Sequence, residues 1–182
     1  KLFSLGEYTG IDLPNEKTGV FPSRQWKKQA IGDIWYPGDT VNTSIGQGYM
    51  TSTPLQIGVM MSGVFNGGKI YKPRIVKGIR KRDTNEYIEK EPELKHQINV
   101  PKEIRDNIMA GLIDAVYKRG GTSRRAAVKE MKIGGKTGTA QVVSAKVTER
   151  YKKDEIPEEY RDNAWFTGVF PARDPKYVVV VL

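Results

Sequence analysis

Two apolar, extended runs near the end of the sequence are separated by only four residues. The runs cover 164–171 and 176–182, and Ala172-Arg173-Asp174-Pro175 joins them. A connection this short joins strands in an antiparallel hairpin, because a parallel pair needs a crossover of roughly a dozen residues or more. The valines of the second run are typical of a buried strand. The sequence therefore predicts an antiparallel sheet that contains both runs.

Two helices are predicted before these strands. Thr53 and Pro54 are a typical helix start, with a capping hydroxyl followed by proline at the first helical position. Pro101 opens the second helix. Helices that precede an antiparallel sheet favour an α+β fold over a parallel βαβ series. The apolar stripes at helical spacing are Ile57, Met60, Met61, Val64 and Phe65 in the first helix, and Ile104, Ile108, Met109, Leu112, Ile113 and Val116 in the second.

The remaining segments carry weaker signals. Residues 1–50 are rich in Gly, Pro, Thr and Asn, so we expect irregular structure anchored by the burial of Trp26, Trp35 and Tyr36. Residues 82–99 are polar and predict an exposed excursion. Residues 130–143 suggest a strand, a Gly-Gly turn and a second strand. The charged segment 144–163 predicts a mobile surface loop.

Composition excludes several kinds of site. The 182 residues include no Cys and one His, His96, which excludes disulfides, thiolate sites and a transition-metal cluster. A complete phosphate-binding loop, a Gly-x-Ser-x-Gly elbow and a Ser-His-Asp triad are absent from the sequence, so we predict no metal and no cofactor. The 30 Lys and Arg outnumber the 21 Asp and Glu by nine, which predicts an acidic partner.

The two ends of the sequence suggest an incomplete domain. It begins at Lys1 without an initiator Met, and it ends inside the valine-rich run. Because a domain rarely stops within a central strand, we expect the domain to be incomplete at both ends. Neither a signal peptide nor an apolar run of the roughly 18–20 residues that span a bilayer is visible.

The strongest chemical signal is Lys136-Thr137-Gly138-Thr139. On a strand, alternating side chains place Thr137 and Thr139 on one face, where two hydroxyls can bind one anion, and Lys136 on the other. Gly138 lets a ligand lie close to the backbone. A strand edge of this kind can bind a carboxylate and pair with an extended peptide.

Further motifs occur in a fixed order around this tetrapeptide. Thr9-Gly10-Ile11-Asp12-Leu13-Pro14 comes first, then Gly46-Gln47-Gly48-Tyr49 with Thr53-Pro54-Leu55-Gln56, then Gly120-Gly121-Thr122-Ser123, and finally Trp165-Phe166-Thr167-Gly168. Over nearly the whole chain, this ordered set resembles the penicillin-binding transpeptidases, and in particular the elongation-type class B enzymes. The resemblance implies that residues 1–182 are the C-terminal part of one transpeptidase domain with a β-lactamase/transpeptidase-like fold, an antiparallel sheet flanked by helices.

The resemblance also implies a peptidoglycan D,D-transpeptidase, a serine acyl transferase that crosslinks stem peptides and binds β-lactams. By this resemblance Lys136 and Thr139 are catalytic, with the Thr139 N–H as one oxyanion donor, and Thr137, Gly138 and Thr139 bind substrate. Gln141 and Trp165 are candidates for lining the cleft, Gly46, Gln47 and Gly48 for positioning a loop, and Arg124 and Arg125 are expected to be solvated charges. The family implies a place on the extracytoplasmic, periplasmic face of the bacterial cytoplasmic membrane and cell-elongation membrane proteins as partners.

The sequence departs from the family in one respect. None of its seven serines has Lys three positions later or Asn two positions later, so the Ser-x-x-Lys and Ser-x-Asn motifs are absent. We expect the nucleophile to lie before Lys1 and the 182 residues alone to be inactive.

Two other functions remain open. A non-catalytic penicillin-binding or scaffold homologue would also lack these motifs, and the residues before Lys1 would distinguish it. A nucleic-acid-binding module is suggested only by the net charge and the basic run 77–82, and its affinity would fall steeply with salt.

Overall fold

The centre of the molecule is a three-stranded antiparallel sheet. The computed structural model describes residues 2–142, 151 and 155–182. The strands are β5 (Gly134–Ala140), β6 (Asn163–Phe170) and β7 (Tyr177–Val181), in the order β5-β6-β7. The predicted hairpin of the last two runs is confirmed, because β6 and β7 are adjacent and antiparallel.

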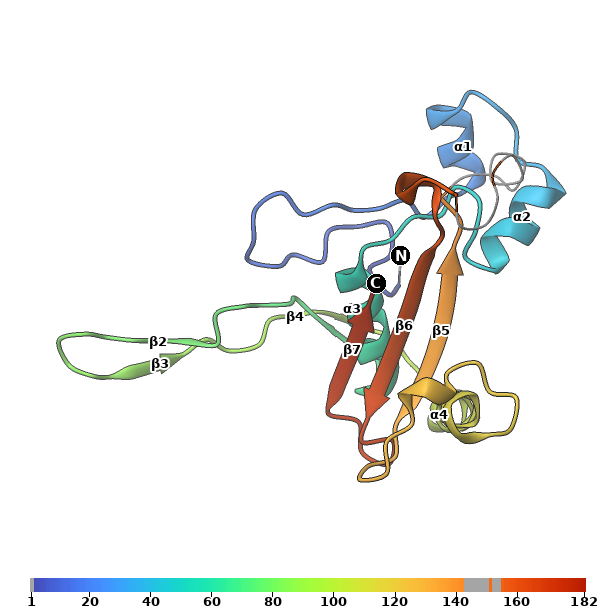
Figure 1. Ribbon diagram of the computed structural model, residues 1–182. Helices are drawn as coiled ribbons and strands as arrows, with labels where there is room; N and C mark the ends of the chain where they lie inside the picture. Colours follow the sequence, from blue (N-terminus) through green and yellow to red (C-terminus); the bar gives the residue numbers. More distant parts are fainter. Residues whose placement is uncertain (1, 143–150, 152–154) are drawn as a thin grey trace.

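Both predicted helices cover the same face of this sheet (Figure 1). They are α3 (Pro54–Phe65), which packs on β7, and α4 (Lys102–Tyr117), which packs on β5. A Cβ added at Gly58 of α3 would lie 3.8 Å from Val180. The mixture of helices and antiparallel strands confirms the α+β class.

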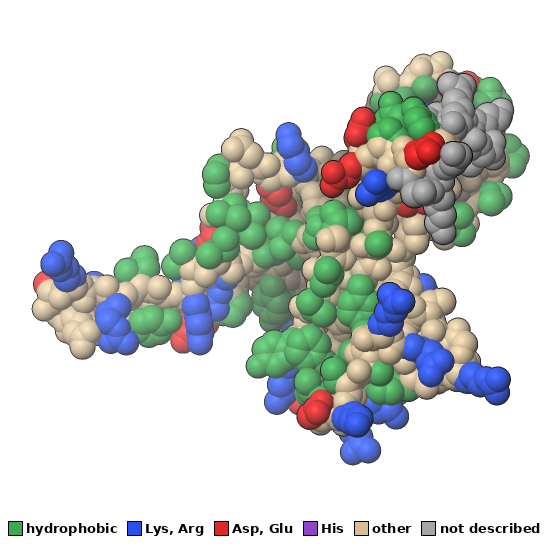
Figure 2. All heavy atoms as spheres, in the orientation of Figure 1, with side chains coloured by type: hydrophobic (Ala, Val, Ile, Leu, Met, Phe, Trp, Pro, Cys, Tyr) green, Lys and Arg blue, Asp and Glu red, His purple; other side chains and the backbone are tan. Residues whose placement is uncertain are grey.

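A second face of the sheet is uncovered by the described residues. We call it the outer face; it carries Phe166, Phe170, Tyr177, Val179 and Val181, which alternate with the side chains under the helices. Tyr177 and Val181 remain 61% and 52% exposed, while Val178 and Val180 on the helix side are half-buried, so the valine-rich strand is partly covered on one face only. Figure 2 shows hydrophobic side chains on this side of the sheet. The expectation of a fully buried strand is therefore wrong for this chain.

The predicted Gly-Gly turn is also wrong. Gly134 and Gly135 are the first two residues of β5. A Cβ at Gly134 would lie 2.9 Å from the Met109 sulfur, and one at Gly135 would lie 2.7 Å from the Phe166 ring. The glycines therefore allow α4 and an aromatic ring to approach the strand, a packing role that the sequence alone does not separate from a turn.

Residues 1–50 contain two helices that the sequence analysis did not predict, α1 (Arg24–Ala30) and α2 (Pro37–Ser44). The aromatic anchors are less buried than expected: Trp26 and Trp35 are half-buried, and Tyr36 is 48% exposed. Within α1, the buried side chain is Lys27, at 2% exposure. Helix-capping side chains explain why short polar segments are helical here, since Ser23 accepts the Trp26 N–H and Asp39 accepts the Tyr36 N–H.

The expected exposed excursion is confirmed. Strand β1 (Lys69–Tyr71) pairs with β4 (Leu94–Gln97), and beyond them β2 (Gly78–Arg80) pairs with β3 (Tyr87–Glu89) in a long arm that projects from the body (Figure 1). Two short 3₁₀ turns, η1 (Arg124–Ala126) and η2 (Glu158–Tyr160), complete the described structure. Of the loop predicted over 144–163, residues 144–150 and 152–154 lie outside the described residues, and the described part contains η2 and the start of β6. No helix in the described part of the chain is long and apolar enough to cross a bilayer.

Candidate active site

The Lys-Thr-Gly-Thr tetrapeptide lies on β5, which is an edge strand with β6 as its neighbour. The expected alternation is observed. Thr137 and Thr139 pair with Phe166 and Ala164 on the outer-face side, while Lys136 pairs with Thr167 on the helix side. Lys136, Gly138 and Thr139 are exposed and Thr137 is half-buried, so the tetrapeptide lies at an open edge and not in the core.

Three side chains bind the backbone at this edge. The Thr137 N–H donates to Ser123 Oγ at 3.1 Å, and Lys136 Nζ donates to the Thr137 carbonyl at 2.6 Å. Gln47 Nε2 donates to the Thr139 carbonyl at 3.2 Å. Because residues two apart on a strand direct their backbone groups to the same side, the Thr139 N–H points away from β6, like that of Thr137. The Thr139 N–H therefore lies on the open edge of β5, on the same side as that of Thr137.

Ser123 was not singled out as a functional residue by the sequence. It is 2% exposed, and its own N–H donates to the Ala115 carbonyl at the end of α4. Its hydroxyl therefore ties the helix to the edge of β5. Ser123 directly follows Gly120-Gly121-Thr122 in the sequence, and nothing local predicts its contact with Thr137, because the two residues are 14 positions apart.

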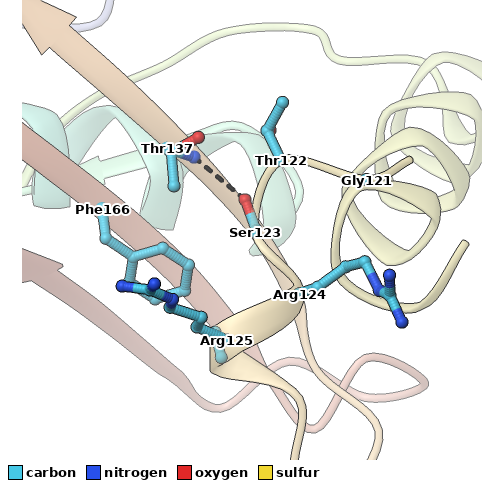
Figure 3. A pocket seen from close by; sticks show the side chains of 8 residues that line it. Gly121, Thr122, Ser123, Arg124, Arg125, Thr137 and Phe166 are labelled. Carbon is cyan, nitrogen blue, oxygen red and sulfur yellow. Dashed lines mark hydrogen bonds between the residues drawn. The ribbon is translucent and has the colours of Figure 1, made fainter. Parts of the chain in front are cut away.

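An open depression of about 640 Å³ lies beside this contact. Figure 3 shows the hydrogen bond between Thr137 and Ser123, with Arg125 extending to the side where Phe166 lies and Arg124 pointing the other way. Both arginines are exposed, as expected for solvated charges. Of the predicted site residues, Thr137 lines the depression, while Lys136, Gly138 and Thr139 lie along the edge outside its lining. The lining residues are Gly121, Thr122, Ser123, Arg124, Arg125, Ala126, Thr137 and Phe166.

Gly138 differs from the other glycines of β5. A Cβ added there would lie 3.5 Å from the Trp165 Cβ, which is an ordinary contact. Packing among the described residues therefore does not require glycine at 138, and the missing side chain leaves the Lys136 face of the strand open at this position. Trp165 is half-buried opposite Gly138, and Gln141 is exposed just after β5; their place in a cleft stays a prediction.

A buried lysine organises the region from which Gln47 extends. Lys27 Nζ contacts Asp39 at 2.7 Å and Asp33 at 3.5 Å, and lies 4.6 Å from the Tyr36 ring centroid. The hydrogen bond to Asp39 raises the pKa of Lys27 although burial opposes it, and the same bond lowers the pKa of Asp39. The pair is therefore charged across the neutral range.

The tripeptide Lys-Thr-Gly occurs a second time, at Lys17-Thr18-Gly19, and the structure separates the two copies. The second copy lies outside any strand. The Thr18 carbonyl accepts from buried Gln56 at 2.6 Å, and Gly19 has a φ of 60°, in the left-handed region that favours glycine. This copy is therefore an irregular segment fastened to the body of the molecule, and not part of a strand edge.

The basic run 77–82 is not a free cationic surface. Lys77 pairs with Glu89 and Lys81 with Glu86, while the Arg80 guanidinium lies 5.6 Å from the Tyr87 ring centroid. Two of its four cationic side chains, Lys77 and Lys81, thus have acidic cross-strand partners, which weakens the main support for nucleic-acid binding. In the described residues, no group of His, Cys, Asp and Glu side chains could hold a metal ion.

Comparison with known proteins identifies the family. The family described as "Penicillin binding protein transpeptidase domain" matches residues 1–182. The chain therefore belongs to the penicillin-binding protein transpeptidase family. Within it, the chain is 37% identical over 184 residues to the peptidoglycan D,D-transpeptidase MrdA of Haemophilus influenzae, a match covering 100% of this chain and 28% of that protein.

Solved structures agree with this assignment. Penicillin-binding protein 2 of Pseudomonas aeruginosa, in complex with WCK 5153, superposes with a TM-score of 0.74 at 31% identity, over 98% of this chain and 36% of that one. Penicillin-binding protein 2 of Helicobacter pylori, in complex with MreC, gives 0.75 at 28% identity, over 98% and 30%. The resemblance to elongation-type class B transpeptidases is confirmed, and the chain spans under a third of the H. influenzae relative.

Proposed function

We propose that this chain supplies the substrate-binding strand of a peptidoglycan D,D-transpeptidase, whose nucleophilic serine lies in a part of the protein outside these residues. The observation that carries the proposal is the edge of β5, where Thr137, Thr139 and Lys136 surround a backbone N–H directed away from the sheet. An extended stem peptide can pair with such an edge.

Each group has a role in acyl transfer. The Thr137 and Thr139 hydroxyls bind the terminal carboxylate of the peptide, and the Lys136 ammonium adds positive potential. The serine oxygen attacks the carbonyl carbon before the terminal D-alanine, and the Thr139 N–H with a second N–H stabilises the resulting oxyanion. The C–N bond then breaks, the amine leaves with a proton, and the acyl group passes to an amine of a neighbouring strand. Losing one oxyanion donor typically costs about 10²–10³ in rate.

The same proposal extends to location and partners. The protein acts on the extracytoplasmic, periplasmic face of the bacterial cytoplasmic membrane, with cell-elongation membrane proteins as partners. The H. pylori relative in complex with MreC supports partners of this kind. β-Lactams bind as analogues of the stem peptide, because their carboxylate fits the two threonine hydroxyls.

A fluorescent penicillin tests the proposal. The full-length protein is expected to be labelled covalently, and the 182-residue chain alone is not. In the full-length protein, Lys136→Ala should lower the acylation rate roughly a hundredfold or more without changing the unfolding temperature. Lys129→Ala, which removes an exposed lysine away from β5, is the matched control.

Two results would contradict this proposal. Labelling of the isolated chain at one of its own serines would place the nucleophile inside it. Absence of labelling in the full-length protein, with a folded domain, would favour the non-catalytic scaffold instead.

A further inference from the structure

Gln47 connects the N-terminal helices to the candidate site. Its Nε2 donates to the Thr139 carbonyl across 92 positions of sequence, at 3.2 Å. Within the described residues, this is the one side-chain hydrogen bond that reaches β5 from the segment 24–50. The bond ends on the residue whose N–H is the proposed oxyanion donor, so the side chain lies where it can influence that donor.

The loop that carries Gln47 is held on both sides. Its backbone N–H donates to the Asn42 carbonyl at 2.9 Å, which fixes it against the end of α2. Two residues later, the Tyr49 ring lies 5.5 Å from the Trp26 ring and 5.5 Å from the Lys27 ammonium. Lys27 is itself buried and bound to Asp39. Gln47 thus extends from a preorganised support and not from a free loop.

The strand needs such a support because of Gly138. The Thr139 N–H belongs to the peptide unit that joins Gly138 to Thr139, and glycine restricts the rotation of that unit least. On one side, Ser123 and Lys136 hold the backbone of Thr137. On the other side, Gln47 holds the Thr139 carbonyl. The direction of the N–H is therefore set by anchors on both sides of the glycine.

We propose that Gln47 is a positioning residue for acyl transfer: by holding the Thr139 carbonyl, it keeps the Thr139 N–H directed at the reacting oxygen. This inference rests on the proposed function. A positioning role acts on the chemical step, since the oxyanion forms only then. The initial, non-covalent binding of the ligand depends instead on the hydroxyls of Thr137 and Thr139, and Gln47 does not affect it.

Rapid-mixing kinetics with a chromogenic β-lactam separate these two steps in the full-length protein. For Gln47→Ala, we expect the acylation rate constant to fall roughly tenfold to a hundredfold, with the dissociation constant of the initial complex unchanged within about twofold. Gln97→Ala is the matched control, because Gln97 also donates to a backbone carbonyl, that of Gly67, away from β5. An unchanged rate constant, or a loss confined to the dissociation constant, would overturn the inference.

A second variant decides the question if Gln47→Ala does not fold. Gln47→Glu keeps the shape but replaces the donor with a carboxylate. Its rate relative to wild type should be low at neutral pH and recover as pH falls through the carboxyl pKa, about 4–5, because the protonated acid can donate again. A ratio that is independent of pH contradicts the positioning role. An unreactive wild type would instead overturn the proposed function, so the two failures are distinguishable.

Discussion

Gly135 and Gly138 lie three positions apart on β5, yet a side chain would meet different surroundings at each. At 135 an added Cβ would lie 2.7 Å from the Phe166 ring, and at 138 it would meet only the Trp165 Cβ at 3.5 Å. The first glycine is required by the packing of the sheet. Packing does not require the second glycine. A glycine at such a position suits a strand whose open edge is to receive a ligand.

These surroundings predict opposite effects for the two alanine variants. Gly135→Ala should destabilise the fold by about 1–3 kcal/mol, because the ring must move out of a packed position. Gly138→Ala should leave the unfolding temperature unchanged and slow penicillin acylation in the full-length protein, because its methyl group restricts the peptide unit that carries the Thr139 N–H. Thermal unfolding and penicillin labelling of both variants check this. Equal loss of stability at 135 and 138 would mean that Gly138 is structural.

At the scale of single elements, α3 depends on one buried amide. Gln56 is fully buried, and its Nε2 lies within 3.2, 2.8 and 2.6 Å of the carbonyl oxygens of Ser4, Glu7 and Thr18. Its Oε1 accepts the Thr53 N–H, while Thr53 Oγ1 accepts the Gln56 N–H, which closes a capping box. The helix start thereby fastens the N-terminal segment to the body.

The capping box and the buried amide can be separated by mutation. Thr53→Ala should cost about 1 kcal/mol, the usual loss for a capping hydroxyl. Gln56→Leu should cost more, because each buried carbonyl left without a partner costs about 1–3 kcal/mol. Denaturant unfolding of both variants measures the difference, with Gln97→Leu at an exposed amide as control. A smaller loss for Gln56→Leu than for Thr53→Ala would show that water replaces the amide.

The elements that the sequence predicts well are those with strong local signals. The start of α3 follows from Thr53-Pro54, and the β6–β7 hairpin follows from a connection of four residues. Helices α1 and α2 were missed because they are short and polar, and because their stability comes from Lys27 and its acidic partners, which lie 6 and 12 positions away. Burial of a lysine is visible only once the chain is folded.

The candidate site divides in the same way. Alternation along β5 correctly places Thr137 and Thr139 opposite Lys136, since the strand period is local. The contacts of Ser123 and Gln47 with that strand could not be predicted, because they depend on how distant segments pack. Gly134 and Gly135 were wrongly predicted as a turn, because a Gly-Gly pair usually indicates one. Here both glycines lie in a strand, where they allow α4 and Phe166 to pack closely.

For the molecule as a whole, the outer face of the sheet is an exposed apolar surface beside the candidate site. Phe170 and Tyr177 stack there with ring centroids 5.3 Å apart, and Val179 is 37% exposed beside them. A contiguous apolar face of this kind marks a surface that another part of a protein covers. The described residues leave it uncovered.

The isolated chain should therefore bind the dye ANS while folded, because the dye reports accessible apolar surface. Val179→Lys should reduce the fluorescence by placing a charge in the middle of the outer face. Val128→Lys, at an exposed valine outside the sheet, should not. Dye fluorescence during a thermal scan measures both effects, and a folded chain that gives no ANS signal would show that the face is not accessible in solution.

The contact between Gln47 and Thr139 also has a consequence for biosynthesis. A ribosome adds about 5–20 residues per second, so the 92 positions between the two partners correspond to roughly 5–20 seconds of translation. During that interval α1 and α2 can fold around Lys27 while their target strand does not yet exist. The edge of β5 therefore acquires its geometry late, after the helices beside Gln47 have already formed.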